Sequence, residues 1–275
     1  MMKIKTLSDT IRPYNFRGKA RLLHSLCPRE GERQTEVFGY QMKVDLADYI
    51  QRSIYLNTFE PCESAQVRQY LKPGMTFVDV GANVGYYTLL AASLVGPRGQ
   101  VLAFEPSPYA FDRLVDAITR NNLSQVCAIQ SGLSDGSGDR RLFLPSQQGN
   151  HSPSMVPNGG GHPINVSVRQ LDDWLAEHDV DCVDLMKIDV EGFEPNVIKG
   201  ASKYIQQGRV RAILCEFNNY WLETNGSSSL QLYDLLKGFG FVSSQSEPDF
   251  ALGVQNILFT FGNQPSLERQ MEPVV

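Results

Sequence analysis

The sequence lacks any long hydrophobic run. Nowhere in its 275 residues do about eighteen apolar residues follow one another, and residues 1–30 contain no apolar core of the length that a secretory signal peptide needs. We therefore expect no membrane span and a cytoplasmic location. Disulfide patterns are missing as well, because the five cysteines are an odd number, widely spaced and without a CxxC pair. They predict buried thiols in a reducing compartment.

A basic surplus is also absent. The chain carries 25 Lys and Arg against 30 Asp and Glu, which gives a net charge of −5 at pH 7. A protein that neutralises the phosphates of a nucleic acid usually carries the opposite excess, so we expect no nucleic-acid partner. The sequence contains no HExxH motif, EF-hand loop or cysteine cluster, so we expect no divalent metal. No heptad repeat or self-complementary strand predicts an oligomeric state.

Strand-like apolar runs alternate with helical stretches from residue 76 onward. This alternation is typical of an α/β fold with a doubly wound, mostly parallel sheet. We predict strands at 76–81, 100–105, 126–131, 183–189 and 211–217, and helices at 84–95, 107–121, 193–206 and 229–238. The runs FGFVSSQ and NILFTF are joined by a short polar loop, so they should form an antiparallel hairpin at the end of the sheet.

Two further segments flank or interrupt this pattern. Residues 1–71 are interpreted as a lead-in packed on the main domain, with a strand in YQMKVDL and a helix from FEPCESAQVRQYL. The main domain spans 72–262, and 263–275 form a C-terminal tail. An insertion at 136–170 should hold a small strand pair and, at the glycines 159–161, a lid, and the helix LDDWLAEH should follow it.

The stretch FVDVGANVGYYT, residues 77–88, falls at the first strand-to-helix turn. Gly81 and Gly85 would let the backbone approach a ligand at the start of the helix. Asp79 would repel the pyrophosphate of a dinucleotide and attract a cation, and the third glycine of GxGxxG is missing. Glu105 ends the next strand, where a carboxylate can accept both ribose hydroxyls. A ribose and a positive charge together describe S-adenosylmethionine.

The sequence resembles the FkbM-type methyltransferases, a branch of the class I S-adenosylmethionine-dependent enzymes. The resemblance rests on LKPGMTFVDVGANVGYYTLLAA, VLAFEPSP, the LDDWL helix and MKIDVEGFEPNVIKGA followed by AILCEFN, within about residues 70 to 220. It implies a Rossmann-like sheet of seven strands whose last hairpin is antiparallel. It also implies O-methylation of a small-molecule hydroxyl acceptor, such as a sugar, glycoside or polyketide.

The same resemblance assigns the residues that would contact the cofactor. The methionine part would be contacted by Asp79, Gly81, Asn83 and Gly85, and the ribose by Glu105. One face of the adenine would be contacted by Pro106 and Ser107, and the other by Ser131 and Leu133. Asp189 would also border the cofactor. Alternatively, the two glycines serve only close packing of the sheet, and Glu105 belongs to a helix cap with Ser107.

Catalysis is expected where the first and fourth strands end side by side. Asp189 is the first candidate for the base that takes the hydroxyl proton, and Glu216 is the second. His151 and His162, in the insertion, rank third. Lys187 shares the strand with Asp189, either as a catalytic residue or as the ion-pair partner of a carboxylate.

Other readings of these residues stay open. Asp189 can also serve the start of the following helix, and Glu191 and Glu194 can simply favour its first turn. Asp189, Glu216 and a loop histidine would make an oxygen-rich site for Mg²⁺, although their spacing does not demand one. Asn218, Tyr220 and Trp221 follow the fifth strand and either shape the acceptor pocket or act as hydrophobic cover.

Three competing functions are weighed against O-methylation. A non-catalytic methyltransferase-like scaffold would keep the fold without turnover. A nicotinamide-dependent dehydrogenase would share the sheet and the ribose acid, but Asp79 and the missing glycine argue against it. An enzyme that methylates amide or base nitrogen would carry an NPPY-type stretch where this chain has DVEG.

Overall fold

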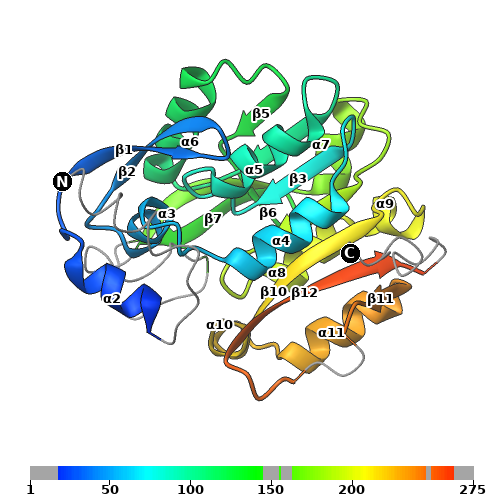
Figure 1. The fold of residues 1–275 in the computed structure, drawn as a ribbon. Helices are drawn as coiled ribbons and strands as arrows, with labels where there is room; N and C mark the ends of the chain where they lie inside the picture. Colours follow the sequence, from blue (N-terminus) through cyan, green and yellow to red (C-terminus); the bar gives the residue numbers. More distant parts are fainter. Residues whose placement is uncertain (1–17, 145–154, 156–162, 246–248, 263–275) are drawn as a thin grey trace, which may run out of the picture.

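The computed structural model describes residues 18–144, 155, 163–245 and 249–262. Its centre is a seven-stranded sheet with the strand order β11-β12-β10-β9-β3-β4-β5 (Figure 1). The strands are β3 (Thr76–Val80), β4 (Gln100–Phe104), β5 (Val126–Ile129), β9 (Leu185–Ile188), β10 (Ala212–Asn218), β11 (Phe241–Ser243) and β12 (Val254–Phe261). The predicted fold class is therefore confirmed.

The central strands are buried on both faces, which explains their continuous apolar sequences. β3 pairs in parallel with β4 and β9, so that Asp79 lies between Ala103 and Lys187 in the ladder. β12 is antiparallel to both β10 and β11. The predicted antiparallel hairpin at the end of the chain is thus confirmed.

Helices follow the strands, as the alternation predicts. They are α5 (Tyr86–Val95), α6 (Pro108–Arg120), α7 (Leu171–Glu177), α8 (Glu194–Gly200), α9 (Ser202–Gln206), α10 (Asn219–Thr224) and α11 (Ser229–Gly238). The single helix predicted at 193–206 is wrong, because the chain breaks at Ala201 into α8 and α9. At this break Gly200 packs on the backbone of Ser134, and a Cβ on Gly200 would lie 2.0 Å from the Ser134 carbonyl oxygen.

The lead-in is more structured than its sequence suggests. It contains α2 (Lys19–Leu26), the antiparallel pair β1 (Glu32–Val37) and β2 (Tyr40–Asp45), α3 (Tyr49–Tyr55) and α4 (Pro61–Tyr70). Leu23 and Met42 belong to the same buried cluster as Phe77 and Leu90 of the main sheet layer. The lead-in, drawn blue to cyan in Figure 1, is therefore part of the same packed body.

The insertion contributes a second, three-stranded sheet. β7 (Gly138–Phe143) and β8 (Pro163–Arg169) form the predicted strand pair, and β6 (Gly132–Leu133) adds to β8 in parallel. The glycines predicted to form a lid lie outside the described residues. No helix in the described part of the chain has the length and apolar character needed to cross a membrane.

The cysteines are free, but not all are buried. Cys27 and Cys215 lie in the interior, whereas Cys62 and Cys127 are exposed. The expectation of buried thiols is therefore wrong for Cys62, in the first turn of α4, and for Cys127, in the edge strand β5.

Gly81 ends β3 at a point where the backbone of β9 comes close. Its φ is +81°, and a Cβ there would lie 2.0 Å from the Asp189 carbonyl oxygen. We expect Gly81→Ala to lower the free energy of unfolding by about 2–5 kcal/mol, because a left-handed conformation and an overpacked contact add up. Urea denaturation measures this loss.

Gly74→Ala is the matched control. Gly74 has a φ of +87°, but a Cβ there would meet nothing within 4 Å. Only the conformational penalty of about 1–2 kcal/mol should then appear. Equal losses for the two variants would show that the contact with Asp189 is not the constraint at Gly81.

Candidate active site

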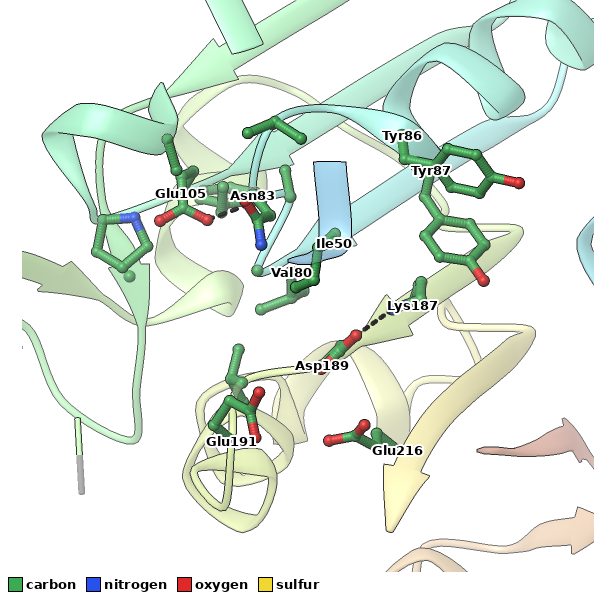
Figure 2. A pocket seen from close by; sticks show the side chains of 18 of the residues that line it. Ile50, Val80, Asn83, Tyr86, Tyr87, Glu105, Lys187, Asp189, Glu191 and Glu216 are labelled. Carbon is green, nitrogen blue, oxygen red and sulfur yellow. Dashed lines mark hydrogen bonds and ion pairs between the residues drawn. The ribbon is translucent and has the colours of Figure 1, made fainter. Parts of the chain in front are cut away.

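A cavity of about 250 Å³ lies at the carboxyl ends of β3, β4, β9 and β10. Its charged lining consists of Glu60, Glu105, Lys187, Asp189, Glu191 and Glu216. Figure 2 labels all of these except Glu60. Crevices at this end of a parallel sheet are the usual ligand sites of α/β folds. The predicted site residues Gly81, Asn83, Pro106 and Leu133 also line it.

Glu105 is held in place by two backbone groups. The Asn83 N–H donates to Oε2 and the Ser107 N–H to Oε1, both at 2.8 Å. Asn83 can reach this position because its φ is +49°, in the left-handed region that asparagine tolerates. Each carboxylate oxygen keeps a lone pair for a further donor from the cavity. Burial raises the pKa of Glu105 to about 7, while the two N–H groups act in the opposite direction.

Asp79 lies behind the glycine turn and does not line the cavity. Its Oδ2 accepts a hydrogen bond of 2.6 Å from the Thr88 hydroxyl. Burial raises its pKa to about 6, against the effect of the Lys187 charge. Asp79 would therefore act on a ligand through its field.

Lys187 is the buried cation of the site. Its Nζ lies 2.7 Å from Asp189 Oδ2 and 4.4 Å from the centre of the Tyr87 ring. Burial lowers the pKa of Lys187, but the Asp189, Glu60 and Asp79 carboxylates raise it above its usual value. Lys187 therefore stays protonated. Its ion pair with Asp189 is one of the two roles that the sequence left open for Lys187.

Glu60 was missed by the sequence reasoning. It precedes α4 with a φ of +37°, and its Oε2 accepts a 2.5 Å hydrogen bond from the Tyr87 hydroxyl. Burial raises the pKa of Glu60, and the Lys187 charge opposes this. The only signal was an acidic residue before Pro61 in FEPCES, which predicts a helix start and nothing more.

Glu216 and Glu194 are both buried but differ in surroundings. Glu216 lines the cavity, and its Oε2 finds no hydrogen-bond partner among the described residues. Burial, together with the Asp189, Glu191 and Glu194 carboxylates, raises the pKa of Glu216 well above its usual range. Glu194 lies outside the cavity lining, and its Oε1 accepts from the Val190 and Gly192 N–H groups of the turn before α8.

Several predicted site residues lie off the cavity wall. Gly85 packs on Leu114, and the Ser131 hydroxyl donates to the carbonyls of Gly132 and Ser167. The others that are absent from the lining are Asp79, Ser107, Asn218, Tyr220 and Trp221. His151 and His162 lie outside the described residues. The roles assigned to all of these residues stay predictions.

Apolar side chains close the rest of the cavity. The lead-in supplies Ile50, Ile54 and Phe59, and the insertion supplies Leu142 and Met155. None of them carries a chemical signal in the sequence, so only the packing reveals them. No three His, Cys, Asp or Glu side chains within the described ranges are placed to hold a metal ion.

The fold is of the doubly wound α/β class, with a cavity at the carboxyl ends of its central strands. Residues 79–243 match the model of the methyltransferase FkbM domain, and the chain belongs to this family. It is therefore grouped with methyltransferases rather than with nicotinamide-dependent dehydrogenases.

Three curated relatives of the chain are also named as methyltransferases. The chain is 31% identical to the 31-O-demethyl-FK506 methyltransferase FkbM of Streptomyces tacrolimicus, over 66% of this chain and 78% of that protein. It is 28% identical to the 2-O-methyltransferase NoeI of Sinorhizobium fredii, over 67% and 82%. Methyltransferase sdnD of Sordaria araneosa is 32% identical over 46% of this chain, and the match spans 60% of sdnD.

Tyr87→Phe tests whether the lead-in is tied to the site through Glu60. The variant removes the donor to Glu60 Oε2 and keeps the ring beside Lys187. Because it leaves a buried acceptor unsatisfied, we expect the free energy of unfolding to fall by about 1–3 kcal/mol. Urea denaturation of Tyr87→Phe, Glu60→Ala and the double variant gives the coupling energy, which should be about 0.5–3 kcal/mol.

Tyr220→Phe serves as the control, because the Tyr220 side chain is 64% exposed. It should change stability by less than about 0.5 kcal/mol. A coupling energy near zero in the Tyr87 and Glu60 cycle would mean that the hydrogen bond does not join the lead-in to the site.

Proposed function

We propose that this methyltransferase transfers the methyl group of S-adenosylmethionine to a hydroxyl group of a sugar, glycoside, polyketide or similar small metabolite. The observation that carries the proposal is the position of Glu105. Its carboxylate opens on the cavity beside the glycine turn, and each of its oxygens has one backbone donor and one free lone pair. Two adjacent ribose hydroxyls are the natural partners of such a group.

The rest of the cavity suits the other parts of this donor. Pro106, Leu133, Leu142 and Met155 offer apolar walls for a flat purine ring. At the other end the turn at Gly81 brings backbone close to the ligand, and the neighbouring carboxylates favour a cationic group. The residues present therefore fit S-adenosylmethionine.

The bound donor would supply an electrophilic methyl carbon. The protein then has to hold the acceptor oxygen in line with that carbon, which is the larger part of such catalysis. As the oxygen forms its bond to carbon, its proton must leave, and Asp189 is our candidate to receive it. The ion pair with Lys187 holds the Asp189 carboxylate in place at the cavity wall. Glu216 is the second candidate for this base.

The relatives support a hydroxyl acceptor. Two of the three are named for methylation at oxygen, one on 31-O-demethyl-FK506 and one at a 2-O position. The lead-in and the insertion are the segments that we expect to select the acceptor.

The experiment that tests the donor is calorimetric titration with S-adenosylhomocysteine, with NAD as the comparison ligand. We expect Glu105→Ala to weaken binding about ten- to a hundred-fold, because hydrogen bonds to a charged group are worth about 1.5–3 kcal/mol. Glu30→Ala, which changes an exposed acid outside the cavity, is the control. Binding of NAD but not of S-adenosylhomocysteine would overturn the proposal.

The pKa of Glu105 leads to a pH dependence. Burial raises it to about 7, so the carboxylate that accepts the ribose hydroxyls becomes protonated as the pH falls below that value. The affinity for S-adenosylhomocysteine should fall by up to about tenfold for each pH unit below this pKa. Glu105→Gln should bind more weakly and lose this step. An equally steep fall in Glu105→Gln would assign the titration to another group, such as Asp79.

Asp189→Asn tests the proposed base. It should lower turnover by about 10²–10⁴-fold, the usual contribution of a positioned base, and change the affinity for S-adenosylhomocysteine by only a few-fold. Transfer of a labelled methyl group to a panel of hydroxylated sugars and glycosides measures the rate. Full turnover in this variant, with Glu216→Gln inactive, would move the role of base to Glu216.

A further inference from the structure

The cavity is unusually acidic for a site that would bind a neutral sugar. Five carboxylates line it and Lys187 is the only lining cation among the described residues. Glu60 accepts from Tyr87, Glu105 accepts from two backbone N–H groups, and Asp189 pairs with Lys187, while Glu191 is not free either. Buried charges in proteins are normally paired in this way.

Glu216 is the exception on the cavity wall. Its side chain is 9% exposed, and Oε2 is buried without a hydrogen-bond partner within the described ranges. Glu194 also has one unpartnered oxygen, but it does not line the cavity. A buried carboxylate oxygen without a donor costs stability, so Oε2 at the cavity wall is an atom that a donor on a bound ligand would satisfy.

The surroundings of Glu216 decide what kind of donor fits. β10 pairs in parallel with β9, and Cys215 stands opposite Ile188, so Glu216 lies beside Asp189. Figure 2 shows its carboxylate directed toward the space between Asp189 and Glu191. The charges of both neighbours act on Glu216. A hydroxyl would satisfy one lone pair, but only a cation would also offset the repulsion among the three carboxylates.

The geometry points to an ammonium subsite formed by Glu216 with Asp189 and Glu191. We infer that the acceptor is a hydroxylated amine, such as an amino sugar, and that sugars bearing a carboxylate are excluded. This inference rests on the proposed function, because it places the subsite at the acceptor end of the same cavity. An ammonium group carries three donors, one of which can meet Glu216 Oε2 while its charge offsets the neighbouring carboxylates. A carboxylate-bearing sugar would instead add a further acid to a corner where Asp189, Glu191 and Glu216 already meet.

The test uses the full chain saturated with S-adenosylhomocysteine and three probes with the same ring: glucosamine, glucose and glucuronate. Calorimetric titration should show glucosamine binding at least about tenfold more tightly than glucose, with no binding of glucuronate. Glu216→Gln should weaken glucosamine binding about tenfold and leave glucose binding within about twofold. Glu223→Gln, which alters an exposed acid on α10, should change neither.

Each outcome decides the inference. Equal affinities for glucosamine and glucose, binding of glucuronate, or no binding of glucosamine would overturn the ammonium subsite. The same holds if Glu216→Gln weakens glucose and glucosamine alike, because Glu216 would then bind a hydroxyl. Failure of the proposed function would be distinguishable from these outcomes, because the protein would then not bind S-adenosylhomocysteine even before a probe is added.

Discussion

The site depends on the ionic interactions of the buried Lys187 ammonium group. A lysine inside a sheet is tolerated only when anions surround it, and here they come from three separate places. Asp189 lies two residues along the same strand, Asp79 is its neighbour in β3, and Glu60 arrives from the lead-in. One cation therefore draws together β3, β9 and a segment that precedes the sheet. The cavity forms where these elements meet.

The other carboxylates of the cavity differ in whether backbone N–H groups hold their oxygens. Glu105 is held by two backbone N–H groups, so its oxygens have fixed directions before any ligand arrives. Glu216 Oε2 has no such support among the described residues and lies in the field of other acids. The first arrangement suits recognition of a constant ligand part, and the second suits a partner that brings its own donors.

The sequence predicted the main sheet well, because strands buried on both faces leave continuous apolar runs and the order of elements limits the topology. It predicted Gly81 and Glu105 on the cavity wall because strand ends at one edge of a parallel sheet converge. It failed at Ala201, where one helical pattern became two helices, and at Cys62, which is exposed. In these places tertiary packing overrode the local pattern.

The sequence by itself determined the doubly wound sheet, the family and the acids at the strand ends, since periodicity and motif spacing are local properties of the chain. Only the tertiary structure decided that Glu60 and Tyr87 join the site, and that Leu142 and Met155 close it. These contacts bridge segments far apart in the chain. The same holds for Glu216 Oε2, which lacks a hydrogen-bond partner within the described ranges, because the bonding of a buried atom depends on neighbours in space that can be distant in the sequence.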